Sequence, residues 1–159
     1  MRVELIHPML VHFPLALLLT GIGLKIVAFF FKRAHFYYYL QIASWMNLGL
    51  GVFFAWMAIL AGGLAEDVVR KNLCKVEFLN DHIFFAYTAT YLFTFALLLD
   101  FGRTWMKRRF SSSFHKVVSI INFLLFLGAT SMLLLTGFFG GSLVYDQGAA
   151  VEKCCKPSG

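Results

Sequence analysis

Two histidines and two prolines stand together near the start of the chain, in the stretch HPMLVHFP that runs from His7 to Pro14. A long apolar run follows this stretch directly. Because imidazole is costly to place in a membrane without a partner, a histidine at the edge of an apolar run marks a candidate functional site. The chemistry open to its ring nitrogens is hydrogen bonding or metal ligation, including ligation of haem iron.

A further histidine, His82, begins another apolar run, and we expect it to face His12 across the interior of a helical bundle. Two imidazoles on opposite sides of a haem supply both axial ligands to its iron. We therefore predict one haem b, held by His12 and His82, with His7 as a reserve ligand. The residues expected around this haem are small enough to leave room for the macrocycle or able to hydrogen-bond the imidazoles: Asn47, Gly51, Ala55, Asp81, Ala86 and Thr90.

Two other interpretations of the histidines stay open. His7 and His12 are about 140° apart on a regular helix, so they share one small ion only if a proline breaks that helix. With such a break, His7, His12 and His82 would form a copper or zinc site made of three imidazoles. Alternatively, the histidines make only interfacial hydrogen bonds, and the protein is a non-redox structural or anchoring subunit of a larger membrane complex.

The composition indicates an integral membrane protein. The 159 residues are 60% hydrophobic and 14% charged, whereas soluble domains are about 45–50% apolar and about 25% charged. The formal net charge is +6, but the basic residues cluster in short loops, which points to membrane topology and away from nucleic-acid binding. No signal peptide is recognisable at the N-terminus, so the first apolar run is expected to remain in the mature protein.

The elements that must position the histidines are four apolar stretches, each expected to form a membrane-spanning helix. The expected fold is therefore an all-α integral membrane four-helix bundle of up-down-up-down order, covering residues 1–140, with a tail over residues 141–159. Because His7 precedes a proline, it is expected just before the first helix, at the membrane surface. The four expected spans are residues 9–31, 37–62, 82–100 and 117–139.

Several residues near the span ends are expected at the membrane surface. Lys25 can extend its ammonium group to the interface, and Asp100 with Gly102 is expected to end the third span. Asn80 or Asp81 is a plausible N-cap for that span. The glycines at Ala61-Gly62-Gly63, after the second span, predict a turn, and Gly137, Gly140 and Gly141, after the fourth, predict a helix end. For the last three glycines, close approach of the backbone to a bound ligand is the alternative. No internal repeat is visible in the sequence.

The loops after the first and third spans carry most of the uncompensated Lys and Arg, so the positive-inside rule places them in the cytoplasm. Both termini and all three histidines of the site then face the periplasm, in a multi-pass protein of the bacterial inner membrane. An oxidising compartment allows a disulfide between Cys74 and either Cys154 or Cys155. Three free thiols are the alternative, and the sequence favours neither.

The opening HPMLVHFPLALLL, the stretch AGGLAED, His82 and the closing GGSLVYDQGAAV resemble the four-span bacterial membrane family catalogued as domain of unknown function 2231. The resemblance covers most of the chain, and the opening and closing motifs are its specific parts. Some members are joined to cytochrome c or Rieske modules, so the resemblance implies a partner of redox proteins and favours haem. Members often carry a histidine where this chain has Gln147, and this difference argues against a second haem.

Together these features predict a b-type cytochrome-like electron-transfer protein and not a stand-alone enzyme. Its expected partners are the lipid bilayer, a periplasmic cytochrome or larger respiratory complex, and the quinone pool. The sequence holds no Ser-His-Asp arrangement, phosphate-binding loop or paired carboxylates within the membrane, so hydrolysis and phosphoryl transfer are disfavoured.

Overall fold

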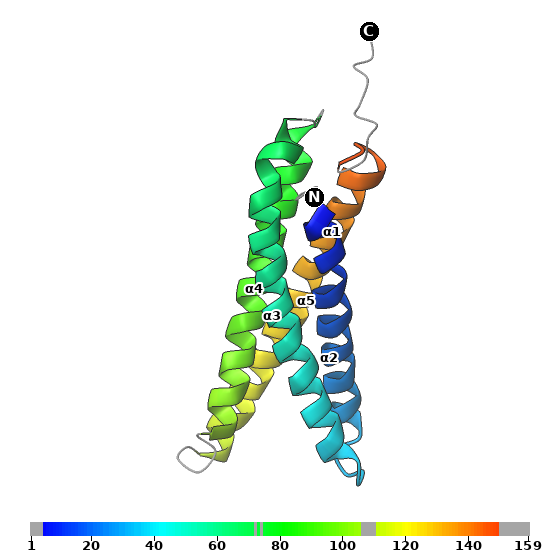
Figure 1. Ribbon diagram of the computed structural model, residues 1–159. Coiled ribbons are helices and arrows are strands. Elements are labelled where there is room, and N and C mark those ends of the chain that lie inside the picture. The colour runs from blue at the N-terminus through cyan, green and yellow to red at the C-terminus, as the bar shows by residue number, and fades with distance from the viewer. Residues whose placement is uncertain (1–4, 72, 74, 106–110, 150–159) are drawn as a thin grey trace.

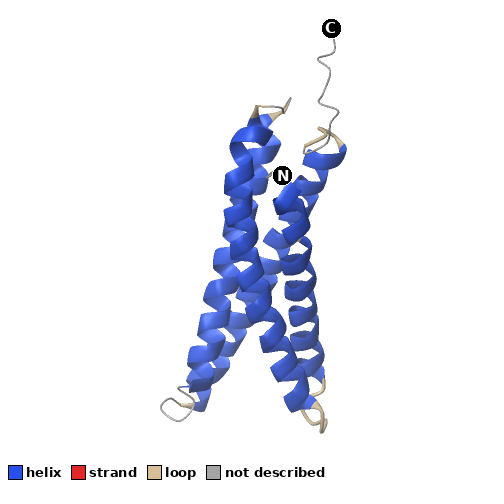
Figure 2. Ribbon diagram, viewed as in Figure 1, coloured by secondary structure: helices blue, strands red, loops and turns tan. Residues whose placement is uncertain are grey.

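The computed structural model describes residues 5–71, 73, 75–105 and 111–149, and within these residues its regular structure is helical throughout (Figures 1 and 2). Residue Val11 alone separates the first two helices, which together form one apolar stretch. Four helical stretches are thus long and apolar enough to cross a membrane, and the predicted all-α four-helix fold is confirmed. The helices are α1 (Ile6–Leu10), α2 (His12–Phe30), α3 (Tyr37–Arg70), α4 (Val76–Trp105) and α5 (Ser112–Tyr145).

The helices extend well beyond the predicted spans, because glycines do not end them. α3 continues through Gly62 and Gly63, and α5 continues through Gly140 and Gly141. A glycine inside a helix costs only about 1 kcal/mol relative to alanine, which packing against a neighbouring helix can outweigh. The turn and the helix end predicted at these glycines were therefore wrong, and the glycine with a positive φ, 68°, is Gly148, after α5.

The start of the first helix also differs from the prediction. α1 begins at Ile6, so His7 is helical, and its carbonyl accepts a hydrogen bond of 3.1 Å from the Val11 N–H. Pro8 is tolerated because it lies in the first turn, where its missing N–H would have no helical partner. Likewise Asn80 and Asp81 lie inside α4, which starts at Val76, and neither caps it.

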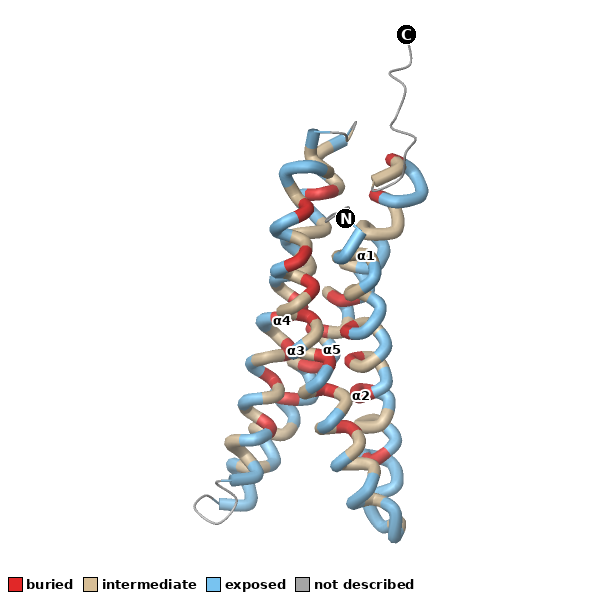
Figure 3. Tube along the Cα trace, viewed as in Figure 1, coloured by how far each residue is buried: buried red, intermediate tan, exposed pale blue. Residues whose placement is uncertain are grey.

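The bundle consists of two helical hairpins, one formed by α1, α2 and α3 and the other by α4 and α5. In the view of Figure 1 the hairpins cross and then diverge toward the lower end, where the ends of α2 and α3 lie well apart from those of α4 and α5. Buried residues follow the faces that meet where the hairpins cross (Figure 3). The large side chains at the centre of this core are Leu18, Leu48, Phe93 and Phe126.

Glycine and leucine interlock where α2 meets α3. A Cβ atom at Gly21 would lie 2.8 Å from Leu48 Cγ, and one at Gly51 would lie 2.7 Å from Leu18 Cδ2. The two helices therefore approach closely because each glycine accepts the leucine of its neighbour. Gly51, predicted to make room for a macrocycle, is instead filled by Leu18.

The two hairpins repeat each other, although the sequence shows no obvious repeat. Positions buried on α2 and α3 recur on α4 and α5, about 75 residues later in the chain. Few matched positions carry the same residue, so sequence comparison alone does not find the relation. The matched buried pairs are Leu18 with Phe93, Gly21 with Ala96, Ser44 with Asn122, Leu48 with Phe126, Gly51 with Ala129 and Ala55 with Leu133.

Candidate functional site

Two histidines, His7 and His82, meet at one end of the bundle, and this end is here named the histidine end. Their ring centroids are 6.1 Å apart and their planes are nearly perpendicular, at 88°. His7 comes from α1 and His82 from α4, so each hairpin contributes one ring. His7 and His82 occupy equivalent positions in the two hairpins, and their rings are in contact, so the pair joins the two halves of the bundle.

Each of the two rings is fixed by a hydrogen bond to a backbone carbonyl. His7 Nδ1 lies 2.8 Å from the carbonyl oxygen of Ala58, and His82 Nδ1 lies 3.0 Å from that of Thr136. A carbonyl oxygen only accepts, so Nδ1 must carry the proton in both rings. The neutral imidazole then has its lone pair on Nε2, which is the arrangement found in histidines that ligate metals.

Each ring also lies against a glycine, one helical turn after the carbonyl that it contacts. A Cβ at Gly62 would stand 3.0 Å from His7 Nδ1, and a Cβ at Gly140 would stand 3.0 Å from His82 Cε1. The glycines thus form two matching cradles, one on α3 and one on α5. Their helical conformation makes no demand for glycine, so the close approach of the imidazole is the reason that a larger residue does not fit.

If the two histidines ligate a metal ion or haem iron, we expect Gly62→Ala or Gly140→Ala to lower the bound metal or haem by about tenfold or more, because supporting contacts to a ligating histidine are worth that much. The added methyl group would push the ring away from its carbonyl partner. Gly63→Ala and Gly141→Ala are matched controls, since a Cβ at either position meets nothing within 4 Å. Ligand content per purified protein measures the effect, and equal content in all four variants would contradict the cradle.

The structure does not bring the predicted partner, His12, to His82. His12 is exposed, and its Nδ1 contacts the carbonyl oxygen of Pro8 in the preceding turn, at 2.8 Å. His7, predicted as the reserve ligand, takes the place expected for His12. α1 and α2 follow each other with only Val11 between them. Five residues on a nearly regular helix correspond to a rotation of about 140°, so His7 and His12 point in different directions.

The other residues predicted around the site do not contact either imidazole through a described hydrogen bond. The Asn47 amide donates to Ala43 within α3, and the Thr90 hydroxyl donates to Ala86 within α4. Asp81 is exposed at the start of α4. Sequence reasoning missed Gly62 and Gly140 as ring contacts and the carbonyls of Ala58 and Thr136 as ring partners.

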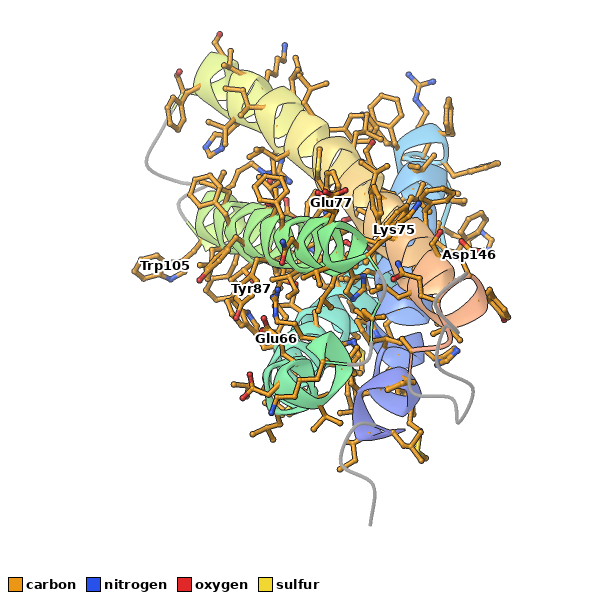
Figure 4. All side chains as sticks on the ribbon, turned by 90° about the horizontal axis from the view of Figure 1, so that it is seen from above. Glu66, Lys75, Glu77, Tyr87, Trp105 and Asp146 are labelled. Atoms are coloured by element: carbon orange, nitrogen blue, oxygen red, sulfur yellow. The ribbon has the colours of Figure 1, made fainter. Side chains whose placement is uncertain are left out.

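The charged residues at the histidine end come from three helix ends and the connection between α3 and α4. Viewed from above, Glu66, Lys75, Glu77 and Asp146 lie around this end of the bundle (Figure 4). The backbone N–H of Lys75 donates to Gln147 Oε1 at 3.0 Å, which ties the start of α4 to the segment after α5. Cys74, Cys154 and Cys155, and so the predicted disulfide, lie outside the described residues.

A second buried polar cluster lies toward the opposite end, here named the aspartate end. Asp100 is 1% exposed and accepts hydrogen bonds from Lys25, Trp45 Nε1, Arg103 and Asn122 Nδ2. The sequence led us to expect Asp100 near the end of a span and Lys25 near the interface, and it did not predict that the two side chains would pair. Instead α4 continues past Asp100 to Trp105, and Lys25 pairs with Asp100 across the bundle, its ammonium nitrogen 5.1 Å from the centre of the Phe126 ring.

The separation of the two imidazoles can be compared with that of two rings on one metal ion. Imidazole–metal bonds are about 2 Å long, so two rings on opposite sides of one ion have centres at most about 6.4 Å apart. The observed separation of 6.1 Å lies below this limit, in an edge-to-face arrangement of the two rings. Among the described residues, no group of three or more His, Cys, Asp or Glu side chains is gathered as a metal site.

No curated protein and no solved structure matches the chain. A family model described as a predicted membrane protein, domain of unknown function 2231, matches residues 4–153. The matched range includes both histidines, both cradle glycines and Asp100. The chain therefore belongs to the family of predicted membrane proteins catalogued as domain of unknown function 2231.

Proposed function

We propose that this protein is a membrane b-type cytochrome that binds one haem between His7 and His82 and transfers single electrons. The observation that carries the proposal is the pair of imidazoles, 6.1 Å apart and each with Nδ1 held by a carbonyl. Each ring is preorganised as an Nε2 ligand, so little conformational freedom is lost when a ligand binds.

The number of protein ligands favours haem over a bare metal ion. Zinc sites use three or four protein ligands, and only two candidate ligands come together in the described residues here. Haem brings four ring nitrogens of its own and needs only two axial ligands from the protein. Haem iron supplies a one-electron couple whose potential depends on axial ligation and burial.

The chain's own residues would hold and insulate such a group. Ala58 and Thr136 orient the two imidazoles through their carbonyl oxygens, and the cradle glycines let the rings sit close to α3 and α5. Nearby aromatic side chains on α4 and α5 are stacked, with Phe85 and Phe139 centroids 5.3 Å apart. Apolar side chains such as these would help to keep water from the proposed haem and to lower the local dielectric constant.

The proposed setting is the bacterial inner membrane, with the histidine end toward the periplasm. The supporting observation is charge: the described cations at the aspartate end include Lys32, Arg33 and Lys116, as expected for a cytoplasmic side. The electron donor or acceptor at the histidine end would be a periplasmic cytochrome or a larger respiratory complex, and the other redox partner would be the quinone pool.

An absorption spectrum of the detergent-purified protein tests the proposal. The expected result is a Soret band whose position shifts on reduction with dithionite, together with the sharp visible bands of a low-spin, six-coordinate haem. Expression should be done with added haem precursor, so that supply does not limit occupancy. A colourless protein under these conditions overturns the proposal, and a colourless protein that retains copper points to a two-imidazole copper site.

A further inference from the structure

The buried cluster at the aspartate end leaves two hydrogen-bonding atoms unused. Asn122 is 2% exposed, and its Nδ2 donates to Asp100, but its Oδ1 has no partner within the part of the chain that the structure describes. The Nε–H group of Arg103 is also buried and equally without a partner there. Since unpaired polar atoms are costly in apolar surroundings, the two atoms indicate a ligand that accepts from Arg103 and donates to Asn122.

The two unused atoms belong to side chains that share one hydrogen-bond partner. Arg103 and Asn122 both donate to the same oxygen, Asp100 Oδ1, at 2.8 and 3.2 Å. The free atom of each side chain belongs to the same guanidinium or amide group as the atom that donates to this oxygen. Asp100 itself offers nothing more to a ligand, because Lys25 and Trp45 take its other oxygen.

The net charge of Lys25, Asp100 and Arg103 favours an anionic ligand. Lys25 and Arg103 carry two positive charges against the single negative charge of Asp100, so the cluster keeps one uncompensated positive charge inside a mostly apolar bundle. One phosphodiester group has the opposite charge. Arg103 is 29% exposed and Lys25 14% exposed, so part of each charged side chain reaches the outside of the helices, while the Nε atom of Arg103 is itself buried.

The position of Arg103 near the end of α4 favours a lipid headgroup as that anion. Arg103 lies two residues before the end of α4, next to Trp105, which is 83% exposed and projects away from the bundle (Figure 4). An exposed tryptophan at a helix end is typical of the headgroup layer of a membrane. Basic groups between spanning helices at this depth are suited to the headgroups of anionic lipids.

We propose that Arg103 and Asn122 bind the headgroup of an anionic phospholipid that carries a free hydroxyl, such as phosphatidylglycerol. A phosphodiester oxygen accepts from Arg103 Nε–H, and the headgroup hydroxyl donates to Asn122 Oδ1. The lipid neutralises the excess charge of the Lys25–Asp100–Arg103 cluster and covers this part of the bundle. The inference is independent of the haem, since it concerns other residues and another ligand.

Native mass spectrometry of the full-length protein, released from nanodiscs made of equal phosphatidylglycerol and phosphatidylcholine, tests the proposal. The wild type should retain phosphatidylglycerol about tenfold over phosphatidylcholine, and Arg103→Gln should lose this preference. Lys116→Gln is the matched control, because it removes one positive charge from an exposed position at the same end. Arg103→Lys keeps the charge but has one donor nitrogen in place of three, with no counterpart of Nε–H, and should restore only part of the preference.

Three outcomes would overturn the proposal. One is equal retention of the two lipids by the wild type, which does not depend on any variant folding. Another is an equal loss in Arg103→Gln and Lys116→Gln, which would reduce the effect to general charge. The third is competition by soluble glycerol phosphate at concentrations similar to those of the lipid, which would indicate a site for a free anion. A retained lipid in a colourless protein would leave this inference standing while the haem proposal fails.

Discussion

The variants His7→Ala and His82→Ala should lose the low-spin haem spectrum, whereas His12→Ala should keep it. Each of the first two would remove one of the two proposed axial imidazoles, and the remaining ring would hold the iron from one side only. His12 is exposed and contacts only the Pro8 carbonyl of its own helix. We expect haem content per protein to fall by about tenfold or more in both variants, measured by the reduced absorption spectrum of equal amounts of purified protein.

The three histidine variants test the geometry as well as the function. If His12→Ala loses the spectrum and His7→Ala keeps it, the ligand pair is the one that the sequence alone suggested. If all three keep it, haem is bound elsewhere. A folding control is needed because His7 and His82 also join the two hairpins, so each variant should elute as a single monodisperse species in detergent before its spectrum is taken.

The apolar runs were enough to predict four spanning helices, because length and hydropathy are local properties of the chain. The choice between His7 and His12 was not local. Two prolines allowed the first helix to start before His7 or after His12, and the two starts place different side chains toward the interior. The deciding contacts are with Ala58 and Gly62, about fifty residues away, and no pattern within the first helix records them.

The Asp100 cluster was missed for a similar reason. Asp100 and Lys25 each lie near the end of an apolar run, where charged residues usually reach the membrane surface. One sequence signal could have linked them: Lys25 follows His7 by the same number of residues as Asp100 follows His82. In a chain made of two similar halves, equivalent positions meet near the axis that relates the halves, and here they carry opposite charges.

Replacing Asp100 by alanine should destabilise the protein by about 3–5 kcal/mol, the range for removing one partner of a buried ion pair. The loss is large because Lys25, Arg103, Trp45 and Asn122 all donate to this carboxylate and would lose their acceptor together. Unfolding in mixed micelles, with dodecyl sulfate as denaturant, gives the free energy. Since the carboxylate is 1% exposed, water cannot replace it without a rearrangement of the helices.

The matched control is Glu66→Ala, which removes a carboxylate from an ion pair with Arg70 on the same helix. Both partners of that pair are more than a third exposed, so the expected loss is about 0.5 kcal/mol or less. Equal losses in Asp100→Ala and Glu66→Ala would contradict a structural role for the cluster. Both variants delete one acidic group from an ion pair, so the difference between them measures the combined effect of burial and of the three further donors to Asp100.

The double variant Lys25→Met, Asp100→Leu separates the ion pair from the remaining donors. Replacing a buried pair by apolar residues of similar volume is often neutral or stabilising. Here Arg103, Trp45 and Asn122 would still lack their acceptor, so recovery relative to Asp100→Ala should be only partial. Full recovery would mean that the Lys25–Asp100 pair accounts for the whole effect, and no recovery would mean that the other three donors hold the two hairpins together at this end.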